Sequence, residues 1–396
     1  MPLSPLARRW AEATPNALAE ARERLARAGQ PVLDLITCSP TQTGLQFPQD
    51  KLIAIAERAL REVESVHHYA PDSRGQRPAR EAIAGHYARR EVAIDADHIT
   101  LSPGTSLSYL WALRLLLKAG EELLAPSPGY PLFDDIAALC GVRLRRYHLS
   151  QQATGWRPDL DEIAFQCTDR TRAIAVISPH NPTGTVWRRE ELAGLRDLCE
   201  ERDLALIFDE VFSEHLAHPV TSLPRPEGFP LAIVLNGLSK MLSLPTWKIG
   251  WMAVTGDVSR CAPLCRSLEH MADTFLAVGE LQQAMVPDLL RAGDSEVIAA
   301  LAGEIGSRRT HAIQSLVPRP ISPEGGVHLC CSLPDSIDDE EFALELLERH
   351  HVSVHPGHYY DLPHHFVMTC VATPEDLTRG AEAINRTLAR RQTAAG

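Results

Sequence analysis

Short apolar runs alternate with amphipathic helical patterns between residues 98 and 255, and this alternation limits the fold more than any other feature. The apolar runs include "HITLS" (98–102), "EELLAP" (121–126), "RAIAVIS" (172–178), "LALIFDE" (204–210) and "LAIVLNG" (231–237). They are continuously apolar rather than alternating, as expected for strands that are covered on both faces. The segments between them, such as 106–120 and 188–203, have helical spacing. We therefore predict an α/β fold, with a mostly parallel sheet between layers of helices.

The pattern changes after about residue 290, where a long helical stretch leads into short strands and further helices. These segments are 325–333, 339–350, 352–355, 366–372 and 374–391. We interpret them as a smaller α+β domain. A chain of 396 residues is too long for one ordinary core and about right for two domains. We predict a large domain at 45–290 and a small domain formed by 1–44 and 291–396.

The charge balance argues against nucleic acid and membranes as partners. The formal net charge is -12, with acidic and basic residues interspersed. No aliphatic run is long enough to span a bilayer, and the N-terminus lacks the apolar core of a secretory signal. Nine scattered cysteines without a CxxC pair indicate reduced thiols, so we expect a cytoplasmic protein. The histidine-rich stretch 351–365 lacks the spacing of a helical zinc site, and we expect no metal.

Ligands of parallel sheets bind beyond the carboxyl ends of the strands, so the strand-to-loop junctions are the places to inspect. After the first run comes "PGTS", in which Gly104 permits close backbone approach. Thr105 and Ser106 offer hydroxyl and amide groups at the start of a helix, which is a favourable site for an anion. Taken alone, the motif is equally typical of a plain helix cap. After the second run, "SPGYP" places Tyr130 at a strand end.

Three further junctions add an amide, a carboxylate and an amine. Asn181 precedes a proline in the tight turn "HNPTG". Asp209 ends a strongly buried strand, where an unpaired carboxylate is costly, so we expect a cationic partner for it. Lys240 follows the last run in "NGLSK", and Lys248 lies eight residues later in an apolar stretch with the pattern of a strand. The set meets the needs of pyridoxal phosphate: a lysine for a Schiff base, an acid for the pyridine nitrogen and a cradle for the phosphate.

The motifs "SPHNPTG" (178–184), "DEVF" (209–212) and "LSK" with "LPTWKIGW" (238–251), in this order and spacing, resemble those of the class I/II aminotransferases. These are fold-type I pyridoxal-phosphate enzymes, similar to aspartate aminotransferase. The resemblance covers nearly the whole chain, from "HHYAPDSRG" at residue 67 to the last helix. It implies a large domain with a seven-stranded, mostly parallel sheet and a smaller α+β domain.

The resemblance also implies roles around the cofactor ring. Lys240 would form the Schiff base with pyridoxal 5'-phosphate and then move the proton between the substrate and the cofactor. Asp209 would pair with the pyridine nitrogen. Asn181 would donate a hydrogen bond to the phenolic oxygen, and Tyr130 would stack on the ring.

At the phosphate, the resemblance implies contacts from Gly104, Thr105 and Ser106. Lys248 takes the position of the family's phosphate-binding arginine. Tyr69, in "HHYAP", matches a tyrosine that reaches the phosphate of the neighbouring subunit. The resemblance therefore implies a homodimer.

The chain departs from the family pattern at three positions. The family has a tyrosine where this chain has Phe212, and an arginine where it has Lys248. The arginine that grips the substrate carboxylate falls on Met368 in "FVMTCVATPEDL". A bidentate arginine contact is the family's main handle on amino acids, so another cation must replace it or the substrate must lack that carboxylate. Candidate replacements are Arg74, Arg77 and a histidine between His355 and His365. In "CSPTQTG", Ser39 and Thr41 are candidate substrate contacts.

The leading hypothesis is an aminotransferase that exchanges an amino group between an amino acid and a 2-oxo acid. The sequence does not identify the donor. The alternative is another pyridoxal-phosphate enzyme on the same scaffold, such as a β-lyase, decarboxylase, cyclase or oxidase, or a transaminase for an amine. A non-catalytic regulator would lack the lysine or carry a DNA-binding domain, and neither is seen. A dinucleotide-binding dehydrogenase would need a G-x-G-x-x-G motif after the first strand, and "SPGTSLSY" does not supply one.

Overall fold

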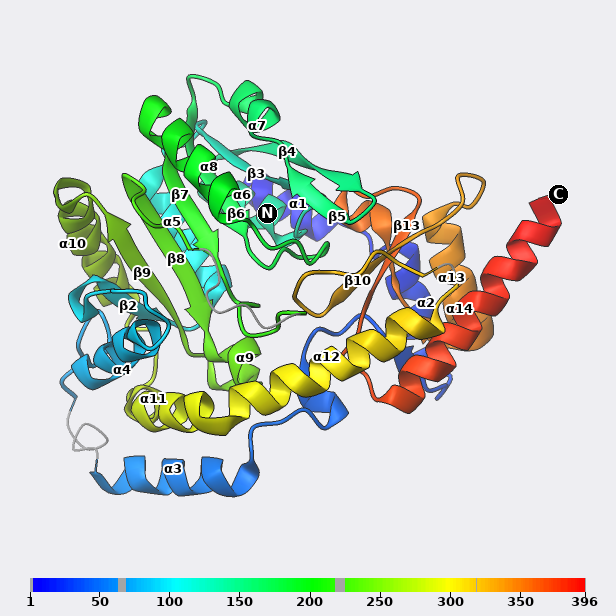
Figure 1. The fold of residues 1–396 in the computed structure, drawn as a ribbon, viewed down its shortest axis with the longest axis horizontal. Coiled ribbons are helices and arrows are strands. Elements are labelled where there is room, and N and C mark those ends of the chain that lie inside the picture. The colour runs from blue at the N-terminus through cyan, green and yellow to red at the C-terminus, as the bar shows by residue number, and fades with distance from the viewer. Residues whose placement is uncertain (1–2, 63–68, 218–224, 318, 396) are drawn as a thin grey trace.

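The central element is an eight-stranded sheet with the strand order β2-β9-β8-β7-β6-β3-β4-β5. The computed structural model describes residues 3–62, 69–217, 225–317 and 319–395 (Figure 1). The strands are β2 (Ile99–Ser102), β3 (Glu122–Ser127), β4 (Arg143–Gln152), β5 (Gly155–Pro158), β6 (Thr171–Ile177), β7 (Ala205–Asp209), β8 (Leu231–Gly237) and β9 (Gly250–Gly256). The pairs β4-β3, β3-β6, β6-β7 and β7-β8 are parallel. The predicted α/β fold with a mostly parallel sheet is confirmed.

Two features of the sheet differ in detail from the expectation. β9 runs antiparallel to both β2 and β8, because the short connection after β8 holds a single helical turn and no crossover helix. The eighth strand, β5, forms an antiparallel hairpin with β4 at the edge of the sheet. The residues of β4 alternate between exposed and buried towards its end, as expected for an edge that is partly solvated.

Helices cover both faces of the sheet, and the buried side chains form a separate cluster on each face. One cluster joins the sheet to α5 (Thr105–Leu116), α6 (Leu132–Cys140) and α10 (Val258–Phe275). The other joins it to α4 (Arg77–Ala88), α7 (Leu160–Gln166), α8 (Arg189–Arg202) and α11 (Glu280–Ala292). This double coverage explains why the strands are apolar on both sides. α3 (Gln49–Glu62) packs on α11 at the lower edge of Figure 1.

Local signals set the ends of several helices. The Asp338 carboxylate accepts a hydrogen bond from the Glu341 amide at 2.9 Å and so caps the start of α13 (Asp339–His350). Asn16 caps α2 (Ala17–Arg27) in the same way, with Ser4 before α1 (Pro5–Glu12). α6 ends at Gly141, whose φ of +69° suits glycine.

The C-terminal part contains a three-stranded sheet with the order β10-β13-β12. Its strands are β10 (His328–Ser332), β12 (His355–Pro356) and β13 (His365–Thr369), and α13 and α14 (Pro374–Ala395) lie beside it (Figure 1). From the N-terminal segment, β1 (Leu33–Asp34) pairs in parallel with β11 (Val352–Ser353). The predicted elements of this part are therefore present. The domain boundaries at 44/45 and 290/291 stay predictions.

One long helical run joins the two parts of the molecule. It consists of α11, a π-helical turn η5 (Gly293–Val297) and α12 (Ile298–Ser315), and Figure 1 shows it in yellow below both sheets. The short helices are η1 (Pro40–Thr43), η3 (Ala96–His98), α9 (Leu238–Met241), η4 (Pro245–Trp247) and η6 (Gly357–Tyr360). Within the described residues, none of the helices combines the length and the apolar character that crossing a membrane requires.

Candidate active site

The carboxyl ends of β6, β7 and β8 lie side by side and carry three of the predicted site residues. Asp209 ends β7 and is in register with Leu235 of β8. The Ser178 amide donates to the Asp209 carbonyl oxygen at 2.9 Å, which holds the turn with Asn181 beside the end of β7. Lys240 lies in α9, immediately after β8. The parallel strands therefore bring the amide, the carboxylate and the lysine to one edge of the sheet, where ligands of such sheets bind.

Asp209 is a buried carboxylate, and its hydrogen-bond partners among the described residues are neutral. The Tyr109 hydroxyl donates to its Oδ2 at 3.0 Å, and the Val211 amide donates to its Oδ1 at 3.0 Å. Burial raises the pKa of Asp209 to about 6, although both hydrogen bonds act in the opposite direction. No salt bridge to Asp209 is formed by the described residues. The cationic partner expected for this carboxylate is therefore not found among the described residues.

The Lys240 amine is half-buried and faces the N-terminal segment of the chain. Its Nζ donates to the Cys38 carbonyl oxygen at 3.2 Å and lies 3.0 Å from the Cys38 Sγ. On another side, Nζ lies 5.9 Å from the centre of the Phe212 ring. His215 donates its Nε2–H to the Lys240 carbonyl oxygen at 2.9 Å and so fixes the backbone of α9. Lys240 is thus positioned by two segments that lie far apart in the sequence, one at Cys38 and one at 212–215.

Three glycines let the start of α5 approach the turn that carries Lys240. A methyl group on Gly250 would lie 3.1 Å from the Gly104 Cα, and one on Gly237 would lie 2.9 Å from the Gly250 Cα. Gly104 also has a φ of +149°, a backbone conformation that residues other than glycine rarely adopt. The first turn of α5 leaves the amides of Thr105 and Ser106 without intrahelical acceptors. These amides form a positive helix terminus suited to a phosphate.

Asn181 and Tyr130 lie near the same carboxylate. Asn181 is 9% exposed, and its Oδ1 has no hydrogen-bond partner among the described residues. Tyr130 makes an edge contact with Phe133, with ring centres 6.4 Å apart. Burial raises the pKa of Tyr130, with smaller contributions from Cys38 and Asp209, so its hydroxyl is within electrostatic reach of both. Tyr130 follows the end of β3 and Asn181 follows the end of β6, so both lie at the carboxyl edge of the sheet.

Lys248 and Tyr69 are exposed in the single chain. Lys248 has a φ of +53° and lies between η4 and β9, which starts at Gly250. The expectation that Lys248 lies within a strand is therefore wrong, because this left-handed residue interrupts the extended backbone. Tyr69 is 85% exposed, at the start of the described segment 69–217. Neither side chain makes a hydrogen bond to another described residue.

The candidate substrate contacts Ser39 and Thr41 hydrogen-bond to each other, with 2.9 Å between their hydroxyl oxygens. They follow Cys38 directly in the chain, which brings them close to Lys240. The sequence of this segment indicates substrate contacts through its hydroxyls alone. Cys38 itself was missed, because an isolated cysteine carries no pattern that would place it beside a lysine.

The candidate replacements for the carboxylate-binding arginine are mostly engaged elsewhere. The guanidinium of Arg74 donates to the Asp97 carbonyl oxygen at 2.9 Å and lies 3.7 Å from the Glu269 carboxylate. Arg77 pairs with Glu81 at 2.7 Å on its own helix. Neither arginine contacts Lys240 or Asp209 in the described structure.

The histidines of the C-terminal part are spread over several positions. His355 shares a hydrogen bond of 2.9 Å with the Tyr360 hydroxyl, and Tyr360 lies within electrostatic reach of Cys38. His358 instead pairs with Asp339 at 3.1 Å, and His365 lies 3.1 Å from the Ser332 hydroxyl. Of this group, His355 is the one connected to the surroundings of Lys240.

Three buried imidazoles and one half-buried imidazole predict a stability that falls in acid. Burial lowers the pKa of His180 and His328 to about 3, and that of His215 and His355 to about 4. Below pH 6.5 these groups bind protons in the unfolded chain but stay neutral in the folded one, so stability is lost as the pH falls. Each contributes about 1.4 kcal/mol per pH unit. We expect urea unfolding of the cofactor-free protein to show a strong loss of unfolding free energy between pH 6.5 and 5. Asp209 reduces this loss, because its raised pKa lets the folded protein bind one more proton below pH 6. His328→Gln should reduce the slope of unfolding free energy against pH by about 1.4 kcal/mol per pH unit, which corresponds to one proton. An unchanged slope would contradict the prediction.

The family profile described as aminotransferase class I and II matches residues 44–384. The arginine–pyruvate transaminase AruH of Pseudomonas aeruginosa is 33% identical over 299 residues, which cover 73% of this chain and 74% of that protein. The glutamate–pyruvate aminotransferase AlaA of Escherichia coli is 27% identical over 373 residues, covering 90% of each chain. None of these comparisons supports the β-lyase, decarboxylase, cyclase or oxidase alternatives.

Solved structures agree with the fold. The alanine aminotransferase of Pyrococcus furiosus superimposes with a TM-score of 0.87 at 24% identity, covering 98% of this chain and all of that one (100%). An aminotransferase from Escherichia coli gives a TM-score of 0.84 at 25% identity, covering 94% of this chain and 95% of that one. The chain therefore belongs to the class I and II aminotransferases, which use pyridoxal 5'-phosphate to exchange an amino group between an amino acid and a 2-oxo acid.

Proposed function

We propose that Lys240 is the residue that binds the cofactor covalently and carries the proton of the transamination, with Asp209 as its electrostatic partner. When bound, pyridoxal phosphate supplies an electron sink for the carbon that exchanges its amino group. The observation that carries the proposal is the buried Asp209 carboxylate, which lacks a cation and ends the strand next to the one that leads to Lys240. A protonated pyridine nitrogen would supply the missing charge.

The neutral partners of Asp209 support this assignment. Tyr109 and the Val211 amide each donate one hydrogen bond, which orients the carboxylate without neutralising it. Asp209 can therefore accept a further, charge-assisted hydrogen bond. The Asn181 side chain, whose Oδ1 has no hydrogen-bond partner among the described residues, would orient the ring from its edge, and the face of Tyr130 would pack against it.

The start of α5 would hold the phosphate. Gly104 leaves its surroundings free of side-chain atoms, with nothing within 4 Å of the position that a Cβ would take. The amides and hydroxyls of Thr105 and Ser106 would donate to the phosphate oxygens. Lys248 would add a point charge, which orients a phosphate less strictly than the two-pronged guanidinium of an arginine.

The Lys240 amine would serve as the proton carrier. Its contacts with the Cys38 thiol and carbonyl are weak enough to be exchanged for a substrate, whereas His215 keeps the α9 backbone in place. General acid–base catalysis of this kind contributes roughly 10²- to 10⁴-fold to a rate. Ser39 and Thr41 would line the substrate side of the same space.

A two-stage experiment tests the proposed function. The holoenzyme is first mixed with single amino acids and no acceptor, and each released 2-oxo acid is quantified by mass spectrometry. A transaminase should release about one 2-oxo acid per subunit and then stop, because its cofactor retains the amino group. Adding pyruvate should then yield alanine. Continuous release of ammonia without an acceptor would contradict the proposal.

We further propose a homodimer in which Tyr69 completes the phosphate site of the partner subunit. Tyr69 is 85% exposed, and it lines a cavity of about 500 Å³ together with Trp111 and the half-exposed Phe275. A tyrosine that reaches across a subunit boundary needs this exposure in the isolated chain. Losing its hydroxyl should weaken cofactor binding roughly 10-fold, the usual effect of one hydrogen bond to a charged group.

Subunit complementation provides the test of this exchange. Tyr69→Phe and Lys240→Ala chains, carrying different affinity tags, are refolded together and the mixed dimers are purified. If Tyr69 acts across the interface, one site of each mixed dimer contains both native residues, and its cofactor affinity should match that of the wild type. If Tyr69 acts within its own chain, no native site forms and the affinity should stay low.

The domain division and the location are proposed on similar grounds. The pairing of β1 with β11 and the contact of Arg22 with Ser353 support a small domain formed by 1–44 and 291–396, apart from a large domain at 45–290. All nine cysteines are free, which supports a reducing compartment such as the cytoplasm.

A further inference from the structure

We propose that the imidazole of His328, rather than a guanidinium, holds the carboxylate of the amino-acid substrate in this enzyme. The inference rests on the proposed function, because it takes Lys240 as the reacting amine. It assigns a carboxylate-binding residue to a chain that lacks the family's arginine at position 368.

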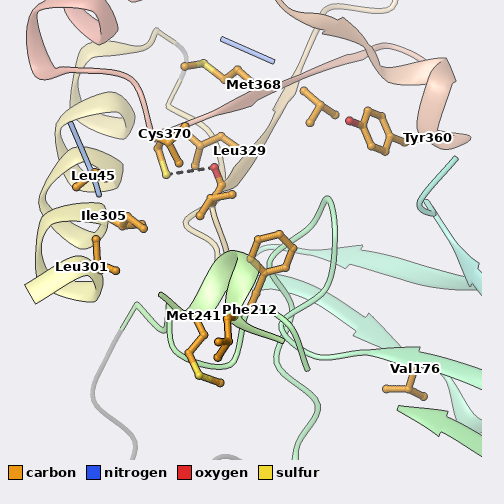
Figure 2. Packing of buried hydrophobic residues seen from close by; sticks show 14 of the residues in the cluster. Leu45, Val176, Phe212, Met241, Leu301, Ile305, Leu329, Tyr360, Met368 and Cys370 are labelled. Carbon is orange, nitrogen blue, oxygen red and sulfur yellow. Dashed lines mark hydrogen bonds between the residues drawn. The ribbon is translucent and has the colours of Figure 1, made fainter. Parts of the chain in front are cut away.

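The position of the missing arginine is closed by the apolar core. Met368 is 1% exposed in β13 and pairs with Leu329 of β10. Figure 2 shows both side chains among the buried hydrophobic residues, with Met368 well apart from Phe212, the residue that contacts Lys240. No cation can reach the substrate from this position.

The arginines that lie near this part of the fold have other partners. Arg22 lies 3.0 Å from the Asp34 carboxylate and also donates to the Ser353 hydroxyl at 3.2 Å. Arg309 is 3% exposed and donates to the carbonyl oxygens of His215, Leu216 and Gly326. Binding a substrate through either guanidinium would break contacts that stabilise the fold. The carboxylate must therefore find a different donor.

His328 is a buried polar side chain near Lys240, and its ring nitrogens have no hydrogen-bond partner among the described residues. It is 5% exposed, its Nδ1 is buried without a hydrogen bond, and no described residue bonds to its Nε2. Its ring makes an edge contact with Phe212, with the centres 5.6 Å apart, and the Phe212 ring lies 5.9 Å from the Lys240 Nζ. The imidazole therefore lies one aromatic ring away from the reacting amine.

The backbone directs His328 towards the N-terminal segment that also touches Lys240. His328 is in register with Thr369, so their side chains share one face of the sheet. On that face the Thr369 hydroxyl donates to the Thr37 carbonyl oxygen at 2.9 Å, and the next residue, Cys38, contacts Lys240. Cys38 thus contacts the Lys240 amine directly, and only the Phe212 ring separates the His328 ring from the same amine.

The charges around His328 require it to act as a neutral donor. Lys240 lowers the pKa of His328 further than burial alone, and both His180 and His355 lie within its electrostatic reach. These neighbouring imidazoles are themselves held neutral by burial. A neutral imidazole can donate one N–H to a carboxylate oxygen. Such a bond is less strictly oriented than a bidentate arginine contact. Because the neutral imidazole carries no charge, the positive charge that balances the substrate carboxylate must come from elsewhere in the site.

The test compares two substitutions at the same position. His328→Phe keeps the aromatic shape and removes the donor, whereas His328→Gln keeps a donor. We expect His328→Phe to raise the KM for the amino acid and for the 2-oxo acid by about 10- to 100-fold, the range for a lost hydrogen bond to a charged group, with a much smaller change in kcat. His328→Gln should stay within about 5-fold of the wild type, and the exposed His364→Gln serves as the matched control.

A binding measurement separates substrate recognition from catalysis. Propionate, which has a carboxylate but no amino group, and its neutral amide are titrated into each holoenzyme and followed by saturation-transfer NMR. The wild type and His328→Gln should prefer propionate over the amide, and His328→Phe should lose this preference. If His328→Phe binds propionate as the wild type does, or raises KM without changing the preference, the inference is wrong.

Two controls keep the result interpretable. Borohydride reduction followed by peptide mass spectrometry should find the cofactor on Lys240 in every variant, which shows that the site is intact. If the wild type itself carries no cofactor on Lys240, the proposed function fails, independently of His328. If His328→Phe does not fold, His328→Leu, which removes the donor without adding bulk, should show the same loss of preference; unchanged preference there would overturn the inference.

Discussion

Replacing Lys240 with alanine should abolish the covalent attachment of the cofactor and nearly all activity. The proposed role gives this residue both the bond to pyridoxal phosphate and the proton transfer, and losing the proton transfer alone costs roughly 10²- to 10⁴-fold. After borohydride reduction, the peptide 238–250 should carry no cofactor. The kcat should fall by at least the roughly 10²- to 10⁴-fold that the loss of proton transfer alone costs. Lys240→Arg, which keeps the charge but cannot form a Schiff base at ordinary pH, should behave like Lys240→Ala.

The control for this experiment is the exposed Lys118→Ala, which should retain both the modification and the activity. An added primary amine provides a sharper check, because it can replace the missing proton carrier. Methylamine should restore part of the activity of Lys240→Ala but not of the bulkier Lys240→Arg. Full modification of another lysine in the Lys240→Ala protein would remove the central assignment.

Replacing Asp209 with asparagine should reduce activity and, without cofactor, increase stability. The carboxylate is proposed to hold the charge on the pyridine nitrogen, and removing a preorganised charge of this kind costs roughly 10²- to 10³-fold in kcat. Asparagine preserves the shape and the contact with Tyr109, so the loss should report on charge. Cofactor affinity should fall with it.

The stability effect has a defined sign and pH range. The pKa of Asp209 is about 6 in the folded protein against an ordinary value of 3.8, so the folded state disfavours the ionised form. Below pH 3.8 both states are protonated and Asp209 costs nothing. Between pH 3.8 and 6 stability falls as the pH rises, and above pH 6 the cost is constant at roughly 3 kcal/mol.

Denaturant unfolding of the cofactor-free proteins checks this effect. Asp209→Asn should exceed the wild type in unfolding free energy at pH 8 and should match it near pH 4. Asp335→Asn, at an exposed position, should show no such difference at either pH. An Asp209→Asn protein that is less stable than the wild type at pH 8 would show that a cation of the chain already pairs with the carboxylate.

The apolar periodicity was sufficient to predict the layered architecture. β6, β7 and β8 are buried along almost their whole length, and strands of that kind require helices on both faces. The hairpin of β4 and β5 and the antiparallel β9 were not predicted, because pairing direction depends on the connecting loop rather than on the strand's own residues.

The sequence likewise indicated some residues of the candidate site and not others. Asp209 and Lys240 could be proposed as site residues because Asp209 ends one buried strand and Lys240 comes shortly after the next, so the strand pattern alone places them at the carboxyl edge of the sheet. His328 could not be identified. It begins a short strand of the C-terminal part, and nothing in "GGVHLCC" indicates that its ring faces Phe212 from an element more than a hundred residues away.

The sequence by itself determined the alternation of strands and helices, the lysine and the carboxylate that we propose for the site, and the family to which the chain belongs. Only the tertiary structure decided which groups surround them. Cys38 meets Lys240 across 202 residues and Tyr109 meets Asp209 across 100. The reason is physical: periodicity reports which face of an element is buried, whereas contacts between distant segments depend on how loops fold and how whole elements pack.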